Sequence, residues 1–349
     1  KGPLILVANH PNTFMDPLLV ASITNQRIGF VANASIFVNR LISKVFNFFH
    51  EIPFFRKQDV GPGEKPDNKK AFVKCHEYLD QLGTLLIFHE GTCYYELILR
   101  DIKTGTARIA LSYEELKEFK GGLKLIPIAL DYSDSIQFRS VVSVTVCKAI
   151  SVDRYKQNYE KNEFQAVLEL TDDIRGELAD IIPQTTGKEQ EEFLVKAHEF
   201  YTAFYAPKAQ LDLNPKQSLE LRNQVSKALQ FLQKENVALY LDTQNKLLLF
   251  FRLLKEEGLK PNLIAKAIVQ RGRWPFYVLS VIKFILLFPI YVFGILTNYI
   301  PYMLTAKIFT ALKLDIEYKA PVQMMTGIFT FPIYYGLMIY IFRFYISSE

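Results

Sequence analysis

The sequence predicts an α/β fold in which a mixed sheet is flanked by helices, followed by a long helical segment and a C-terminal membrane helical hairpin. In the first half of the chain, short apolar runs alternate with stretches of helical periodicity, the pattern of a sheet covered by helices. From about residue 153 the sequence changes to long polar helices. The last part contains two apolar runs, each long enough for the roughly 20 residues that a helix needs to cross a bilayer.

Composition favours a protein that is associated with a membrane. The 349 residues are 50% hydrophobic and 14% aromatic, which is high for a soluble enzyme. A formal net charge of +5 suits contact with anionic lipid or phosphorylated substrates, and it is too small to indicate nucleic-acid binding. Cys75, Cys93 and Cys147 lack the spacing of a metal site, so we expect no metal and a reduced domain that faces the cytoplasm.

The stretch that organises the chain is Ala8–Pro17, which reads Ala-Asn-His-Pro-Asn-Thr-Phe-Met-Asp-Pro. It follows an apolar run that predicts a buried strand, Leu4–Val7, and precedes one that predicts a helix, Leu18–Ala21. The Asp-Pro pair fits an N-cap followed by the first helical position. His10 and Asp16 thus flank a strand-to-helix turn at the rim of the sheet, where α/β proteins commonly place chemistry. Because six residues are not a whole number of helical turns, the two side chains can meet only if the loop folds back.

The other elements of the first half follow from hydrophobic periodicity, helix caps and turn residues. A loop rich in Gly and Pro over residues 61–66 separates two of the expected helices. The expected strands are Arg27–Val31, Thr84–Phe88, Leu123–Leu130 and Val141–Val146, and the expected helices are Ser35–Phe49 and one that begins at Asp67 or Asn68 and stops at Gly83.

Two long helices with apolar faces are expected in the second half, over Lys188–Tyr205 and Ser218–Lys234, and we interpret them as a lid or as packing structure. Asn214 followed by Pro215 is a candidate boundary. We therefore divide the chain into an α/β domain that includes polar helices, a helical linker region and a transmembrane hairpin, over residues 1–214, 215–272 and 273–349.

The apolar runs of the tail are Phe276–Ile300 and Val322–Ile341. Each contains a proline near its middle, which membrane helices tolerate. We favour a helical hairpin over the alternative of two interfacial or re-entrant helices. Lys266, Arg271 and Arg273 precede the first run and indicate that it starts on the cytoplasmic side of the membrane.

The Asn-His pair, a short spacer and Asp resemble the first motif of the PlsC-type glycerolipid acyltransferases, which move a fatty acyl group from a thioester to a hydroxyl of a glycerol phosphate. That motif usually has four residues between His and Asp, whereas this chain has five, Pro11–Met15. The longer spacer resembles the glycerol-3-phosphate acyltransferase branch of the family. The resemblance implies that His10 is the general base on the acceptor hydroxyl, and that Asp16 orients the ring and stabilises the imidazolium.

Two further segments resemble apolar motifs of the same family. Ile52–Arg56 resembles the second motif, which ends in Arg, and it implies that Arg56 binds a phosphate through its guanidinium fork. Leu125–Leu130 resembles the fourth motif, which is apolar around a Pro. A buried strand there is also compatible with the lining of an acyl tunnel.

The segment Phe88–Thr92 resembles the third motif, which usually reads Phe-Pro-Glu-Gly-Thr. The resemblance implies that Glu90, Gly91 and Thr92 help to bind the acceptor, with the Gly allowing close approach of the backbone. His89 replaces the usual Pro. We expect His89 to have a structural role, because no partner carboxylate for it is evident.

A last segment, Lys103–Leu111, resembles a basic stretch of glycerol-3-phosphate acyltransferases. A Gly turn that leads into a helix, with Lys103 and Arg108 nearby, can bind phosphate through backbone amides and side-chain charge. The alternative is a capped basic helix with no ligand. In motif order, the resemblance covers roughly Gly2–Ser151.

The sequence therefore predicts a membrane-anchored acyltransferase of phospholipid biosynthesis that acylates glycerol-3-phosphate. The donor is acyl-CoA or acyl carrier protein, and no cofactor and no nucleic-acid partner are expected. The expected partners are the two substrates and a lipid membrane. Acyl carrier protein is a further partner if it is the acyl donor. Three alternatives stay open: an acceptor such as lysophosphatidate or another lysophospholipid, a non-catalytic lipid-binding membrane protein, and a thioesterase.

Overall fold

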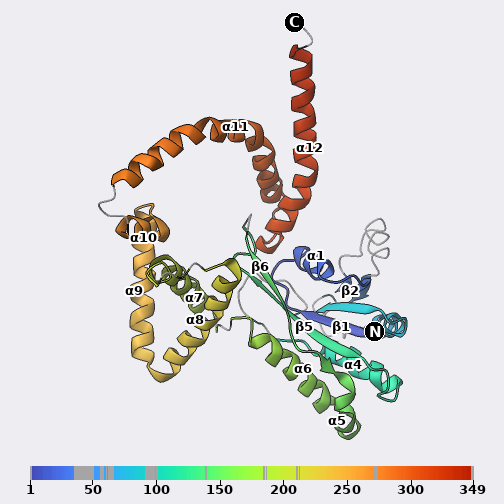
Figure 1. Cartoon of the computed structure of the whole chain (residues 1–349). Coiled ribbons are helices and arrows are strands. Elements are labelled where there is room, and N and C mark those ends of the chain that lie inside the picture. The colour runs from blue at the N-terminus through green and yellow to red at the C-terminus, as the bar shows by residue number, and fades with distance from the viewer. Residues whose placement is uncertain are drawn as a thin grey trace.

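The computed structural model describes residues 2–34, 51–55, 59, 61, 67–90, 99, 101–137, 140–183, 185, 187–209, 211, 213–269 and 274–346. Figure 1 shows an α/β unit, a helical segment at its side, and two long apolar helices above both. The predicted fold class is confirmed by a seven-stranded mixed sheet flanked by helices. The predicted helix Ser35–Phe49 lies outside the described residues.

The sheet has the strand order β3-β2-β4-β1-β5-β6, and β7 also pairs with β5. The first five strands run parallel to their neighbours, whereas β6 and β7 pair antiparallel with β5. The parallel strands therefore all have their carboxyl ends at one edge, where loops of α/β proteins build their sites. The strands are β1 Leu4–Ala8, β2 Ile28–Asn33, β3 Glu51–Phe54, β4 Thr84–Phe88, β5 Lys124–Tyr132, β6 Val142–Val146 and β7 Ile150–Ser151.

Strand β3 is absent from the sequence-based expectations, although it carries most of the apolar segment before Arg56. It is only four residues long and includes Pro53, so it shows neither a long apolar run nor a clear alternation. In the structure β3 is an edge strand of the sheet. An edge position tolerates Pro, which has no backbone N–H and cannot donate a hydrogen bond to a neighbouring strand.

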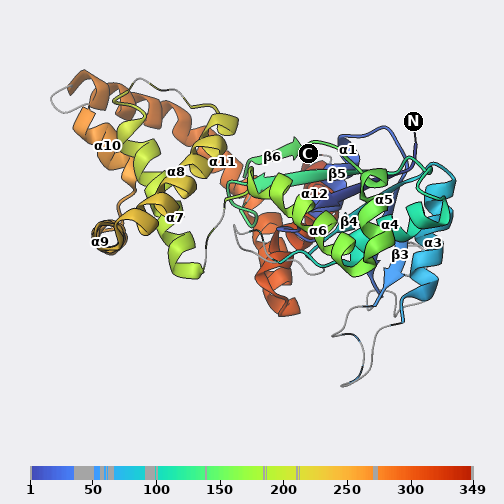
Figure 2. The ribbon, with the colours of Figure 1, turned by 90° about the horizontal axis from the view of Figure 1, so that it is seen from below.

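Helices cover the two faces of the sheet unequally. On one face α3 Lys69–Asp80, α4 Gly105–Leu116 and α6 Glu163–Ala179 bury the larger apolar core, and α5 Lys156–Lys161 leads into α6. Figure 2, seen from below, shows α4, α5 and α6 in front of the strands. On the other face α1 Met15–Ser22 is the one helix in the described part of the chain that packs on the smaller core.

The helix predicted to stop at Gly83 is confirmed as α3, but its last turn is closed by Leu82, which has a positive φ of 56°. Gly83 is required for a different reason. A Cβ added there would lie 2.5 Å from ring atoms of Tyr78, and its backbone N–H already donates to the Tyr78 carbonyl. Close packing at the turn, rather than a left-handed backbone, therefore selects the glycine.

The helical segment at the side of the sheet consists of α7 Lys188–Phe200, which continues as a π-helical turn, α8 Pro215–Glu235, α9 Val237–Glu256 and α10 Pro261–Val269. Asn214 caps α8 in a reciprocal capping box with Gln217. The segment is joined to the sheet by a buried ion pair between Arg222 of α8 and Asp131 at the end of β5. Whether the division after residue 214 separates folding units stays a prediction.

The two apolar helices are α11 Trp274–Leu312 and α12 Lys319–Ile346. By length and composition both could cross a membrane, over Tyr277–Leu312 and Lys319–Arg343. The first helix is longer than the predicted apolar run, because it continues past Ile300 and includes Pro301 as well as Pro289. Figure 1 shows α11 as an arch whose later part descends beside α12. These features suggest membrane association.

We expect the full-length chain to remain with membranes during extraction by carbonate or by high salt, because apolar helices of this length are held by the hydrocarbon core. Sedimentation of the extracted membranes and immunodetection of the chain measure this. A chain that ends near Lys260 lacks both helices and should be released far more readily. Full release of the intact chain by salt alone would mean that the tail makes only electrostatic contact.

Candidate active site

The loop between β1 and α1 folds back on itself and joins the two predicted catalytic side chains. Its turn is closed by the carbonyl of Asn12, which accepts the backbone N–H groups of Met15 at 2.9 Å and of Asp16 at 3.1 Å. His10 Nδ1 lies 2.8 Å from Asp16 Oδ2. The carboxylate is fully buried, whereas the His10 side chain keeps 18% of its surface exposed.

The expectation that Asp16 caps α1 is wrong. The helix begins at Met15 with Phe14 in the cap position, so Asp16 is already within the first turn. The turn at Asn12 runs directly into the helix, and no side chain at the cap position makes a capping hydrogen bond. The Asp16 carboxylate is therefore free to bind groups other than the helix amides, and its Oδ2 accepts the Asn12 backbone N–H at 2.7 Å as well as His10.

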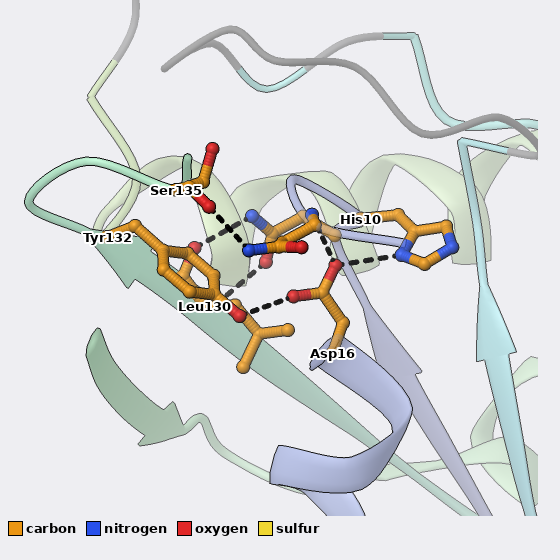
Figure 3. Close-up of polar contacts among 7 residues, drawn as sticks. His10, Asp16, Leu130, Tyr132 and Ser135 are labelled. Carbon is orange, nitrogen blue, oxygen red and sulfur yellow. Dashed lines mark hydrogen bonds and ion pairs between the residues drawn. The ribbon is translucent and has the colours of Figure 1, made fainter. Parts of the chain in front are cut away.

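A third donor reaches Asp16 from a distant part of the chain. The Tyr132 hydroxyl, at the end of β5, donates to Asp16 Oδ1 at 2.6 Å. Figure 3 shows the carboxylate between the Tyr132 ring on one side and the His10 ring on the other. A buried carboxylate is costly unless it is hydrogen-bonded, and these three donors satisfy it.

Two asparagines attach the same loop to β5. The Asn9 side chain pairs with both backbone groups of Leu130, accepting its N–H at 2.8 Å and donating to its carbonyl at 2.9 Å. The Asn12 side chain donates to the Ser135 carbonyl at 2.6 Å. The loop is therefore attached to β5 on both sides of the Tyr132 contact, and these bonds fix the position of the His10–Asp16 pair (Figure 3). Sequence reasoning did not identify Tyr132, because nothing local distinguishes it from other residues at strand ends.

The His10 ring is oriented on its other face by an aromatic neighbour. It stacks on Phe88 of β4 with ring centroids 3.9 Å apart and an interplanar angle of 12°. Because a carboxylate can only accept, the nitrogen that faces Asp16 carries a hydrogen, and in the neutral form of the ring the second nitrogen has the lone pair. Figure 3 shows that second nitrogen on the far side of the ring from Asp16. The arrangement can accept a proton from a group that approaches the exposed side.

Ala8 and Phe88, the last residues of β1 and β4, are paired in the sheet. His89 and Glu90, which follow β4, therefore lie at the same edge of the sheet as His10, which follows β1. His89 is buried, and neither ring nitrogen has a hydrogen-bond partner among the described residues. Burial, with smaller contributions from Arg175 and His10, lowers the pKa of His89 to about 3. His89 is therefore neutral at physiological pH. Glu90 is also buried, at the end of the strand.

The predicted phosphate-binding residues are only partly described. Lys103 and Arg108 flank the start of α4, and both are exposed. The Lys103 backbone N–H donates to the His89 carbonyl at 3.0 Å, which attaches the start of α4 to the edge of the sheet that carries His10. Arg56, Gly91 and Thr92 lie outside the described residues.

No group of three or more His, Cys, Asp and Glu side chains that could hold a metal ion occurs within the described residues.

No curated protein matches this chain. Residues 1–131, which carry His10, Asp16 and the parallel strands that hold them, match the protein-family model described as Acyltransferase, and this match supports an acyltransferase enzyme.

Proposed function

We propose that this protein is a membrane-bound acyltransferase that moves a fatty acyl group from acyl-CoA or acyl carrier protein to a hydroxyl of glycerol-3-phosphate. The observation that carries the proposal is the His10–Asp16 pair. A buried carboxylate with three donors orients an imidazole whose second nitrogen faces outward, at the carboxyl edge of the parallel strands and within the stretch that resembles acyltransferases. His-carboxylate pairs of this kind serve as general bases.

In this mechanism donor and acceptor bind together beside His10. The outward nitrogen of His10 removes the proton of the acceptor hydroxyl as its oxygen forms a bond to the thioester carbonyl carbon. Asp16 stabilises the imidazolium that results. The tetrahedral intermediate then breaks its carbon–sulfur bond, and the thiolate leaves with the proton that His10 returns. Because the acceptor supplies the nucleophile, no acyl-enzyme intermediate is required.

The choice of acceptor rests on charge. Glycerol-3-phosphate is small and dianionic, so its binding depends on several cationic or N–H donors. Lys103 and Arg108 form no ion pair with a described residue, and both lie at the start of a helix, where backbone N–H groups favour an anion. We assign Arg56, Glu90, Gly91 and Thr92 to the same acceptor site on the strength of the motif resemblance. These groups favour a small phosphorylated acceptor.

A second candidate acceptor is lysophosphatidate or another lysophospholipid. One observation favours it: Phe14, two residues from Asp16, exposes its apolar side chain. Burial of an acyl chain contributes about 0.8 kcal/mol per CH₂, so such an acceptor needs fewer phosphate contacts.

Competition between the two acceptors tests the proposal. The purified enzyme is given glycerol-3-phosphate and lysophosphatidate at equal concentration, with acyl-CoA or acyl carrier protein as donor. We expect mainly lysophosphatidate as product, and we expect Lys103→Ala and Arg108→Ala each to raise the KM for glycerol-3-phosphate, because each removes a charge. Mainly phosphatidate would favour the second acceptor. An unchanged KM in both variants would contradict the charge argument, whichever product forms.

A further inference from the structure

The end of β5 that carries Tyr132 extends beyond the neighbouring strand β1. Ala8, the last residue of β1, is paired with Ile128, so residues 129–132 of β5 have no partner in β1. On that side the Asn9 side chain takes the place of a strand and bonds to the β5 backbone. On the other side β6 pairs with the whole stretch. The position of the Tyr132 hydroxyl therefore depends on what else holds the end of β5.

The residue before Tyr132 is held from the opposite face of the sheet. Side chains alternate along a strand. Tyr132 belongs to the smaller core, beside α1, whereas Ala129 belongs to the larger core, so Asp131 points to the side of the larger core. There Arg222 of α8 donates to the Asp131 carboxylate, and the two side chains expose 4% and 8% of their surface. Among the ion pairs of the described residues, it is the one in which both side chains are almost completely buried.

Stability alone is a poor explanation for this pair. Moving two charges out of water is costly, and a buried ion pair is often no more stabilising than apolar residues of the same volume. The Nε atom of Arg222 is also buried, and it has no hydrogen-bond partner among the described residues, which adds to the cost. What a buried, directional bond of this kind does supply is a fixed position of one element relative to another.

We infer that Arg222 is a positioning residue for the His10–Asp16 pair, a role that rests on the proposed function. Its bond to Asp131 fixes the end of β5, and the next residue, Tyr132, donates to Asp16 at 2.6 Å (Figure 3). The carboxylate that receives this bond orients the His10 ring. The helical segment at the side of the sheet thus contributes to the geometry of the candidate active site, although it lies outside the residues that match the family model.

A double-mutant cycle tests whether Arg222 acts through Tyr132. Arg222→Lys keeps the charge but loses the guanidinium fork. It should lower kcat several-fold with the KM of both substrates unchanged, and by no more than Tyr132→Phe lowers it. Because both changes act on one hydrogen bond, Arg222→Lys should cause little further loss in a chain that already carries Tyr132→Phe. Equal losses with and without the Tyr132 hydroxyl would overturn the inference.

Arg154→Lys is the matched control for this cycle. It alters another Arg–Asp pair, with Asp173 of α6, which is exposed and has no contact with the end of β5. We expect it to leave kcat unchanged. A loss as large as that of Arg222→Lys would show that any weakened Arg–Asp pair slows the enzyme, and it would count against the inference.

A charge-free pair separates geometry from charge balance, and it also serves if Arg222→Lys does not fold. Arg222→Met combined with Asp131→Leu removes both charges and leaves none unpaired in the interior. Thermal unfolding should show a Tm close to that of the unaltered chain, whereas kcat should stay several-fold low. Recovery of the full kcat would overturn the inference, because Arg222 would then do no more than neutralise Asp131.

Fluorine NMR tests the same contact without any assay of activity. The full-length chain carries 3-fluorotyrosine at position 132 and is studied in detergent micelles. Asp16→Ala removes the acceptor and gives the resonance of a Tyr132 hydroxyl without this bond. We expect Arg222→Lys to move the resonance towards that value and Arg154→Lys to leave it in place.

An unchanged resonance in Arg222→Lys would overturn the inference even if kcat falls. If the unaltered chain transfers no acyl group at all, the proposed function fails. The fluorine resonance still decides in that case whether Arg222 holds the Tyr132 hydroxyl at Asp16.

Discussion

Replacement of His10 by alanine should lower turnover by at least about 10²-fold, the contribution that a positioned general base typically makes. His89→Ala should cost much less. Of these two histidines, only His10 has a buried carboxylate on one ring nitrogen, and only the His10 side chain is partly exposed. Turnover of both variants is measured with the same donor and acceptor. A larger loss for His89→Ala than for His10→Ala would reverse the assignment.

The properties of His89 give this comparison its physical basis. Its pKa of about 3 makes it a weak base at neutral pH, and its burial keeps it from the substrate. The sign of its effect on stability follows from the same shift. The unfolded chain binds this proton near the ordinary histidine pKa of 6.5, whereas the folded chain does not bind it until the pH approaches about 3. The folded state therefore loses no stability through His89 above about pH 6.5, and it loses stability as the pH falls from there towards about 3.

Asp16→Asn is the second change for which we expect a large effect, of at least about 10² in turnover, since the same replacement costs about 10⁴ in the Ser-His-Asp triad. An amide can donate to the ring nitrogen that now donates to Asp16. The ring would then carry its hydrogen on the outward nitrogen, which could no longer accept the hydroxyl proton. Steady-state kinetics at saturating substrate measure the loss. Turnover within a few-fold of the unaltered enzyme would show that Asp16 does not set the tautomer.

Tyr132→Phe provides the graded comparison. It removes one of the three donors to Asp16 but leaves the His10 contact and the Asn12 contact in place. We therefore expect a measurable loss that is clearly smaller than that of Asp16→Asn. Tyr159→Phe is the matched control, because it removes a tyrosine–carboxylate hydrogen bond of 3.0 Å to Glu115, on the opposite face of the sheet. Equal losses for the two tyrosine variants would point to general destabilisation.

Local patterns determined much of the α/β unit. The apolar runs of β1 and β4 and the periodicity of α3 are signals within a few consecutive residues, so they predicted these elements nearly to the residue. The spacing of His10 and Asp16 likewise indicated that the loop between them had to fold back. The composition of the tail indicated two helices long enough for a membrane.

Only the tertiary structure decided how the candidate site is held. Tyr132 donates to Asp16 across 116 residues, Asn9 pairs with Leu130 across 121, and the Asn12 side chain donates to Ser135 across 123. Each contact exists because β1 and β5 are neighbours in the sheet, although the strands β2, β3 and β4 and the helices α1, α3 and α4 lie between them in sequence. The order of parallel strands depends on the packing of the whole sheet, and no pattern within a single strand specifies its neighbour. The sequence by itself therefore identified the His10–Asp16 pair, while the strand order brought Tyr132 to the carboxylate, because that order is set by contacts between distant residues.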